Sequence, residues 1–281
     1  MINFRGFFVN ENQEREPFEE YISKLPLGGW SLENLGVSED ERYDIYGMRL
    51  NSNQEGKPYF FFRSSVHGNE WESAYWARYF AEFIGDPSLA PAELEDYFIK
   101  LKFNYNWYWI PIHNPYGYEH NTRENSNGVN LNDDLGDLSQ IENVYMVDLL
   151  HEFKPVCAVD NHSWDHSSTP CHAMSIYREG QYDRTVTQEL LFHALKNVQY
   201  VTEERVNHYT SSGHDPTKFR SWLARQTSSS GLNTMVWLIE TDRLAPISDQ
   251  IRQGFNALLT FFLYTDIWYR KGIQNPINID F

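Results

Sequence analysis

A short polar motif at residues 64–70, with the sequence SSVHGNE, carries an imidazole and a carboxylate three residues apart. It follows the apolar run at residues 59–62, so His67 and Glu70 would stand just beyond a strand. On a turn or a first helical turn, side chains at this spacing point to one side and can share one divalent metal. Gly68 between them permits a tight backbone. Taken alone the pair is weak evidence, because a capped helix start with an incidental histidine looks the same.

A further histidine, His162, follows another apolar run, at residues 156–159, within the motif DNHS. It lies far from Glu70 in the sequence, so it completes a metal site only if sheet topology brings the strand ends together. Two histidines and one glutamate form a known catalytic zinc set whose fourth position stays open for water. The alternative is an ordinary hydrogen-bonded histidine in a histidine-rich stretch, since His166 and His172 lie nearby.

Glu240 comes directly after five apolar residues, 235–239, with the sequence MVWLI. A carboxylate in that position is costly unless it has a partner or a purpose. In a cleft of low dielectric it can act as the general base on metal-activated water. The competing explanation is a carboxylate at a strand end that pairs with a cation such as Arg243.

The segment at residues 114–132 is rich in turn-forming residues, beginning with Asn-Pro and ending near an Asn-Gly pair. We expect a loop throughout, and polar loops after a strand commonly carry function. Arg123 is a candidate to stabilise a developing oxyanion. Asn132 is a candidate to form a hydrogen bond with a substrate terminus.

The alternation of apolar runs with helical patterns predicts an α/β fold with a mixed, mostly buried sheet flanked by helices. The expected strands are residues 43–50, 59–62, 103–110, 156–159 and 235–239. The expected helices are residues 17–23, 70–83, 144–153, 185–198, 218–225 and 247–268. Sites in such sheets gather just beyond strand ends, where the candidate residues fall.

Length and composition predict a single domain over residues 1–281, with residues 1–40 as a leading segment. The formal charge of −16 repels phosphate groups, which makes nucleic acid and anionic membranes poor partners. No stretch approaches about 20 apolar residues and no signal peptide is visible, so a cytoplasmic location is the default expectation. The two cysteines, Cys157 and Cys171, do not make a disulfide scaffold.

Together the motifs occur in the order found in zinc carboxypeptidases of the carboxypeptidase A type, which the chain resembles over residues 40–270. The stretch N-P-Y-G-Y to L-N is the specific part, and H-G-N-E and the later His-Ser gain weight beside it. The resemblance implies an eight-stranded mixed sheet, one zinc ion per chain and hydrolysis of a peptide bond near a C-terminus. It also implies residue roles, namely the ligands His67, Glu70 and His162, the base Glu240, the carbonyl-polarising Arg123 and the terminus-holding Asn132.

The chain departs from the family pattern at three positions. Asp133 stands where the family has an arginine that binds the substrate carboxylate. Asn130 stands where the family usually has an aspartate behind the first histidine ligand, so that ligand loses a charged partner. The mobile tyrosine that covers substrate has no clear match, and Tyr209, expected in a loop at residues 207–214, is the candidate.

These departures predict a peptidase acting on atypical peptide ends, in which a cation or an amide meets Asp133, and the protein is expected to be a monomer. Bacterial cell-wall peptides, which carry diamino acids, are one candidate substrate, and an internal peptide is another. A nearby cation from Lys218, Arg220 or Arg225 could instead replace the missing arginine. Two alternatives stay open. One is a zinc-dependent deacylase of N-acyl amino acids, which shares the zinc set and carries motifs similar to H-G-N-E. The other is a non-catalytic binding module on the same scaffold, against which the retained Glu240 argues.

Overall fold

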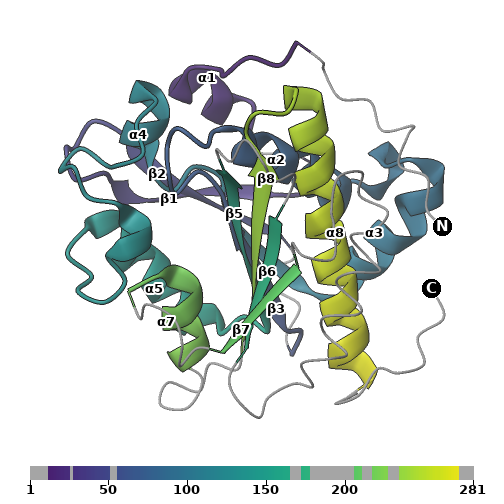
Figure 1. Cartoon of the computed structure of the whole chain (residues 1–281). Coiled ribbons are helices and arrows are strands. Elements are labelled where there is room, and N and C mark those ends of the chain that lie inside the picture. The colour runs from purple at the N-terminus through teal and green to yellow at the C-terminus, as the bar shows by residue number, and fades with distance from the viewer. Residues whose placement is uncertain are drawn as a thin grey trace.

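Helices cover both faces of a central sheet in the computed structural model of the chain (Figure 1). The structure describes residues 12–25, 28–50, 56–164, 172–177, 206–210, 217–226 and 234–271. The two faces of the sheet carry separate hydrophobic cores, so the strands in its middle are buried on both sides.

Within the described residues, eight strands form one sheet in the order β1-β2-β4-β3-β5-β8-β6-β7. They are β1 (Ser31–Val37), β2 (Asp44–Leu50), β3 (Tyr59–Arg63), β4 (Asn106–Ile110), β5 (Cys157–Trp164), β6 (His172–Tyr177), β7 (Val206–Thr210) and β8 (Met235–Asp242). The central strands β4, β3, β5 and β8 run parallel, whereas β2 and β6 flank them in antiparallel pairing. The predicted α/β class, a mixed sheet between helices, is confirmed.

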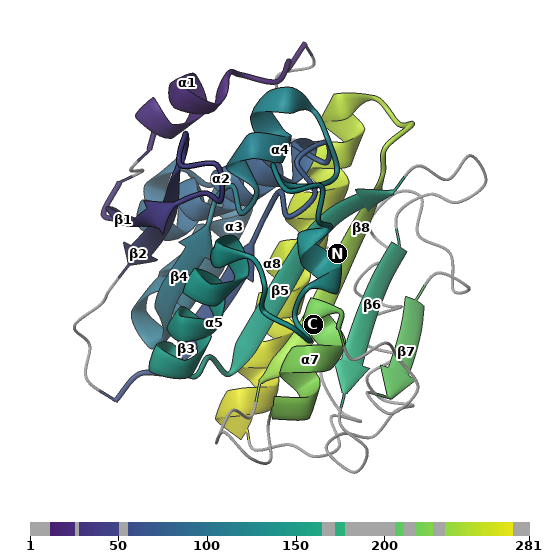
Figure 2. The same ribbon diagram turned by 90° about the vertical axis from the view of Figure 1, so that its left-hand side faces the viewer.

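The helices are α1 (Phe18–Ser23), α2 (Glu72–Gly85), α3 (Ala92–Asn104), α4 (Pro115–His120), α5 (Ile141–Phe153), α7 (Phe219–Gln226) and α8 (Ile247–Lys271). Two short 3-10 turns, η2 (Pro87–Leu89) and η3 (Leu131–Asp133), join them. α2, α3 and α8 pack on one face of the sheet, and α5 and α7 pack on the other (Figure 2). In the described part of the chain, no helix is both long and apolar enough to cross a membrane.

Successive side chains of β3 point to opposite faces of the sheet and pack into the two hydrophobic cores in turn. Phe60 and Phe62 belong to the core that includes α2 and α8, whereas Phe61 belongs to the core that includes α5 and α7. Successive residues of a strand point to opposite faces, so a strand covered on both sides must be apolar at every position. The uninterrupted aromatic run therefore follows from the burial of β3.

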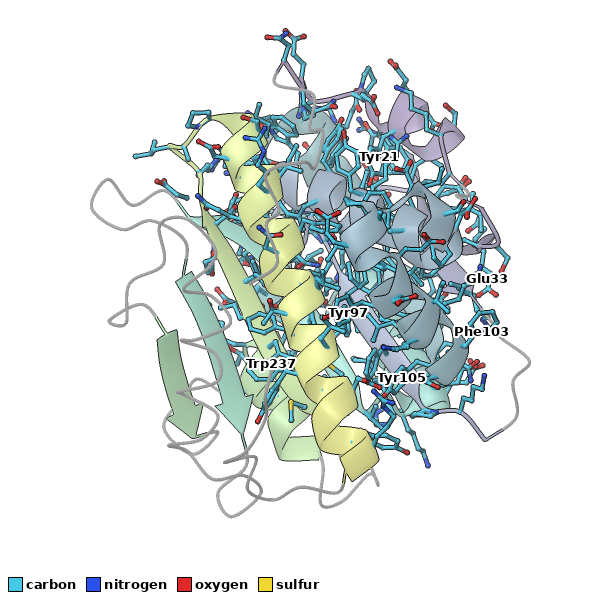
Figure 3. The ribbon with its side chains drawn as sticks, turned by 90° about the vertical axis from the view of Figure 1, so that its right-hand side faces the viewer. Tyr21, Glu33, Tyr97, Phe103, Tyr105 and Trp237 are labelled. Atoms are coloured by element: carbon cyan, nitrogen blue, oxygen red, sulfur yellow. The ribbon has the colours of Figure 1, made fainter. Side chains whose placement is uncertain are left out.

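The longest helix, α8, lies along one face of the sheet and is fixed there by aromatic contacts (Figure 3). The ring of Trp237 in β8 stacks on Phe261 with ring centroids 4.6 Å apart. The hydroxyl of Tyr105 donates a hydrogen bond of 2.8 Å to Asp266, so this phenol is satisfied although it is buried. The first contact ties α8 to β8, which carries Glu240, and the second ties it to the end of α3.

Two strands run several residues further than the apolar pattern predicts. β5 continues to Trp164 and β8 to Asp242, so His162 and Glu240 lie within strands and not after them. The prediction ended each strand at its last apolar residue, but backbone pairing continues through polar residues wherever a neighbouring strand supplies the partners. In this register His162 and Glu240 are direct neighbours across the two parallel strands.

The segment at residues 114–132, predicted to be a loop throughout, contains α4 and η3. The side chain of Asn114 caps α4 by accepting a 2.8 Å hydrogen bond from the Gly117 N–H. Pro115 occupies the first helical turn, where a missing N–H costs nothing. Asn114, Pro115 and Gly117, expected from the sequence to be turn-forming residues, form the start of a helix in the structure. The strand predicted at residues 103–110 is also shorter, because α3 runs to Asn104.

Part of the predicted leading segment is built into the fold. β1 pairs with β2 in antiparallel register, and α1 places Phe18 in the core. The helix predicted at residues 185–198, together with His166 and Cys171, lies outside the described residues. Cys157 is buried in β5 as a free thiol.

The loop that carries His67 packs directly on the loop that follows α4. The Asn69 N–H donates a 2.9 Å hydrogen bond to the carbonyl of Thr122. A Cβ atom added at Gly68 would overlap the backbone of Gly117, and that backbone has no flexible side chain that could yield. The close approach of the two segments therefore requires glycine at position 68.

We expect Gly68→Ala to lower the stability of the protein by about 2 kcal/mol or more, since overpacking in a well-packed site costs 1–3 kcal/mol. The measurement is thermal and denaturant unfolding beside zinc content. Gly28→Ala is the matched control, because its new Cβ would meet its nearest neighbour, Asp86 Cβ, at an ordinary 3.5 Å. Equal unfolding temperatures for both variants would contradict the steric argument.

Candidate metal centre

Three buried side chains converge at the C-terminal end of the central strands. His67, Glu70 and His162 each offer a ligand atom, and these atoms lie within 4.8 Å of one another. The two Nδ1 atoms are 3.2 Å apart, and the Glu70 carboxylate oxygens lie 2.7 Å and 2.8 Å from the Nδ1 atoms of His67 and His162. Ligand atoms about 2.0–2.1 Å from one tetrahedral zinc would be about 3.3 Å apart. In the described part of the chain this is the one cluster of its kind.

Local backbone structure places these groups. His67 and Glu70 lie in the turn between β3 and α2, which the Glu70 N–H closes by donating to the His67 carbonyl at 3.0 Å. The Ser73 hydroxyl donates to the Glu70 carbonyl at 2.8 Å and accepts from the Ser65 N–H at 2.8 Å. Ser65 has a φ of 53°, a strained conformation that the packed turn maintains. His162 comes from β5, the strand next to β3.

The hydrogen bonds of Asn130 fix which nitrogen of His67 faces the cluster. Asn130 Oδ1 accepts from the Asn132 backbone N–H at 3.0 Å, so the atom at this position is an oxygen. The same oxygen lies 3.0 Å from His67 Nε2, which must therefore carry the proton. The Nδ1 lone pair of His67 is left for a metal. Asn130 thus lies behind the first histidine, as the resemblance implies, with an amide oxygen in place of a carboxylate.

The second histidine has a carboxylate behind it. Nε2 of His162 lies 3.1 Å from Asp160 Oδ2, and both side chains are buried. The contact is an ion pair. Its geometry is too poor for a hydrogen bond, so Nε2 has no hydrogen-bond partner in the structure. A carboxylate beside Nε2 favours a proton on that nitrogen and directs Nδ1 to the cluster.

Electrostatics of the cluster suit a cation. Burial would raise the pKa of Glu70, yet the two imidazoles hold it well below its usual range. Burial lowers the pKa of His67. Burial would also lower the pKa of His162, but the Asp160 and Glu70 carboxylates outweigh it and raise that pKa to about 10. Without a metal, the site therefore retains a proton on His162, and a divalent cation between the three groups would replace it.

Two further predicted residues lie near the cluster. Arg123 Nη1 donates to Glu70 Oε1 at 3.3 Å, and the arginine side chain is 44% exposed. Glu240 lies opposite His162 in the register of β5 and β8, and its charge contributes to the raised pKa of His162. Register partners on adjacent parallel strands point to the same face, so Glu240 lies on the same face of the sheet as His162.

The region predicted to hold the substrate terminus carries an ion pair in place of an arginine. Asp133 Oδ1 pairs with the ammonium of Lys218, and Asp133 Oδ2 accepts from Asn130 Nδ2 at 2.8 Å. The adjacent Asn132 is buried, and its Oδ1 accepts from Arg63 Nη2 at 3.2 Å. Tyr209 lies in β7 and not in the predicted loop, and its side chain is outside the described residues.

Three charged residues near the cluster escaped the sequence analysis. Arg63 and Asp160 are completely buried register partners on β3 and β5. Each follows an apolar run, and that placement is the signal that could have singled them out. Glu72 is buried at the start of α2, where burial raises its pKa to about 7 and the Ser163 hydroxyl donates to it at 3.4 Å.

Comparison with known proteins identifies the family. A family model described as zinc carboxypeptidase matches residues 30–175, just over half of the chain. That span contains His67, Glu70, Arg123 and His162 and ends before Glu240. A comparison with curated proteins gives no match.

Solved structures share the fold. A putative carboxypeptidase A from Shewanella denitrificans aligns with a TM-score of 0.71 and 19% identity, over 89% of this chain and 70% of the other. A metallo-carboxypeptidase from Burkholderia cenocepacia gives 0.66 and 15%, over 89% and 68%. A carboxypeptidase A from Helicoverpa armigera gives 0.65 and 16%, over 90% and 72%. At such identities the likeness establishes the architecture alone.

The family match and the site geometry agree. The matched span supplies a His-Glu-His cluster that can hold a metal, and the family it represents is zinc-dependent. The chain belongs to the zinc carboxypeptidase family and is a metallopeptidase of that family.

Proposed function

We propose that the chain hydrolyses peptide bonds with one zinc ion per chain, held by His67 Nδ1, Glu70 and His162 Nδ1. The observation that carries the proposal is the convergence of these three groups, with the far nitrogen of each histidine beside another polar side chain. Zinc in such a set lowers the pKa of its water to about 7 and polarises a carbonyl. Two imidazole nitrogens and one carboxylate match the donors that zinc prefers, once the metal has displaced the proton of His162.

Protein side chains perform the proton transfers and stabilise charge. In the proposal Glu240 accepts a proton from the attacking water and passes it to the leaving amine. Its place beside His162 supports this role, because a base must stand within reach of the water. Arg123, in contact with Glu70 and partly exposed, is placed to meet the oxyanion that develops on the scissile carbonyl. One such donor typically contributes about 3 kcal/mol.

We propose that the end of the substrate peptide carries a negative charge and a positive charge. The ion pair of Asp133 and Lys218 replaces the single arginine that grips a carboxylate in the family. An α-carboxylate could pair with Lys218 while an amine pairs with Asp133, which fits an end with a diamino acid, as in bacterial cell-wall peptides. A single cation would suit an ordinary free carboxylate better than this pair does. We therefore propose atypical, amine-bearing peptide ends as the preferred substrates.

Purified protein should contain about one zinc ion per chain, and His162→Ala should lose most of the metal and all activity. The reason is that the remaining two ligands cannot complete the set. Elemental analysis and a peptidase assay measure both. His151→Ala, an exposed histidine of α5, is the control that should keep both. Full zinc occupancy in His162→Ala would transfer the ligand role to His166 or His172.

Glu240→Gln should keep the fold and the zinc but lose turnover by roughly 10²–10⁴-fold, since the change preserves shape and removes the base. Steady-state kinetics and elemental analysis test this. Glu72→Gln is the matched comparison, because Glu72 is another buried carboxyl group near the cluster. Loss of turnover in Glu72→Gln, with Glu240→Gln remaining active, would make Glu72 the base.

Matched peptides with free, amidated and amine-bearing ends test the substrate proposal. Partly exposed pairs are worth up to about 1 kcal/mol, so Lys218→Met should raise KM for free carboxylates about fivefold. Asp133→Asn should raise KM by a similar factor, but only for amine-bearing ends. Zinc content serves as the control, because Asp133 also contacts Asn130. A wild-type preference for plain carboxylate ends, unchanged in Asp133→Asn, would refute the proposal.

A further inference from the structure

The guanidinium of Arg63 is completely buried at the end of β3, and Asp160 lies between it and His162 of the candidate metal centre. Its five N–H donors all have partners at the following distances: Asp160 Oδ1 at 2.7 Å, Asp160 Oδ2 at 3.0 Å, Asn132 Oδ1 at 3.2 Å, His113 Nδ1 at 3.1 Å and Met146 Sδ at 3.5 Å. The ring of Phe219 lies 4.0 Å from its Cζ. A buried cation is tolerated only with such complete satisfaction, so the surroundings hold Arg63 in one geometry.

One side of this guanidinium holds Asp160. Nε and Nη2 donate to the two carboxylate oxygens in a bidentate fork, which fixes both the position and the plane of the carboxylate. Oδ2 of that carboxylate faces His162 Nε2 at 3.1 Å. Asp160 is thus held by Arg63 where its charge faces the far nitrogen of His162 and leaves Nδ1 toward the cluster.

Another side of the guanidinium holds Asn132. A guanidinium has no acceptor, so the atom of the Asn132 amide that faces Arg63 must be Oδ1. The amide then offers its N–H groups elsewhere, which is the orientation needed to donate to a carbonyl or carboxylate of a bound peptide. Arg63 therefore decides whether Asn132 acts as a donor or an acceptor toward substrate.

The third partner of the guanidinium, His113, is a neutral acceptor in one tautomer. Its Nδ1 must accept from Arg63, and its Nε2 then donates to the carbonyl of Glu142 at 3.2 Å. Burial lowers the pKa of His113 to about 3, and the Arg63 charge acts in the same direction, so the ring stays neutral. A neutral acceptor beside the guanidinium leaves Asp160 as its anionic partner.

We propose that Arg63 is a positioning residue that couples the two halves of the site. Through Asp160 it orients the zinc ligand His162, and through Asn132 it orients the donor for the peptide end. The inference rests on the proposed function and adds a requirement to it, because metal binding and substrate binding then share one guanidinium. Loss of that guanidinium should weaken both, while loss of either partner should weaken only one.

The test compares Arg63→Met, Arg63→Lys, Asp160→Asn and Asn132→Ala. Zinc affinity is measured by competition with a chromophoric chelator, and KM and kcat are measured on peptides. Partners behind metal ligands typically contribute 10–100-fold in affinity, so Arg63→Met and Asp160→Asn should bind zinc at least tenfold more weakly. Asn132→Ala should keep wild-type zinc affinity and raise KM. Arg63→Lys keeps the charge but lacks the fork, and should show both defects in a protein that still folds.

Arg49→Met is the matched control, since Arg49 also lies over an aromatic ring, that of Phe153, and pairs with a carboxylate, that of Glu33. It should lose stability without losing zinc affinity. If Arg63→Lys folds with unchanged zinc affinity and KM, the coupling is refuted and Arg63 is a core residue only. Zinc affinity needs no turnover, so a wild type that binds zinc without cleaving peptides would refute the proposed function and still leave the zinc-affinity comparison of Arg63→Met, Arg63→Lys and Asp160→Asn to be made.

Discussion

The parallel pairing of β3, β5 and β8 is the constraint on which the site depends. In this register Arg63 lies beside Asp160, and His162 lies beside Glu240. A slip of one residue would turn every side chain of β5 to the opposite face and carry His162 away from Glu70. The apolar residues of β5 prevent such a slip, because each is matched to one of two different cores. Core packing thus sets the positions of His162 and Glu240.

The two histidines of the cluster are supported in different ways. An amide oxygen stands behind His67, and a carboxylate stands behind His162. A carboxylate increases the basicity of an imidazole more than an amide does, so the two ligands are electronically unequal. The amide is itself held by a carboxylate, because Asn130 donates to Asp133. The charge that family members place directly behind the first histidine is here one hydrogen bond further away.

Much of this site could be predicted from the sequence. His67 and Glu70 lie in one turn, so their spacing suggests that they face the same side, although the pair alone is weak evidence for a metal site. His162 and Glu240 needed family resemblance, because only strand order brings them together. The sequence could not reveal the pairing of Arg63 with Asp160, since nothing in either local pattern states that β3 and β5 are neighbours. Helix α4 was missed for a different reason, because Asn114 and Pro115 serve equally in a turn or at a helix start.

The chain has a net charge of −16, and two cations near the proposed substrate region are each paired with a carboxylate. Arg63 is matched by Asp160, and Lys218 is matched by Asp133, so neither cation presents an isolated field. At about 4 Å and an effective dielectric of about 20, one unpaired charge is worth roughly 4 kcal/mol, which would dominate selection of a substrate end. The ion pair of Asp133 and Lys218 acts as a dipole. A charged group of the substrate is therefore attracted from one side of the pair and repelled from the other. Under the proposed function, recognition would depend on how two opposite charges of the substrate are arranged, and the Asn132 amide, whose Oδ1 accepts from Arg63, would lie beside this ion pair with its orientation fixed.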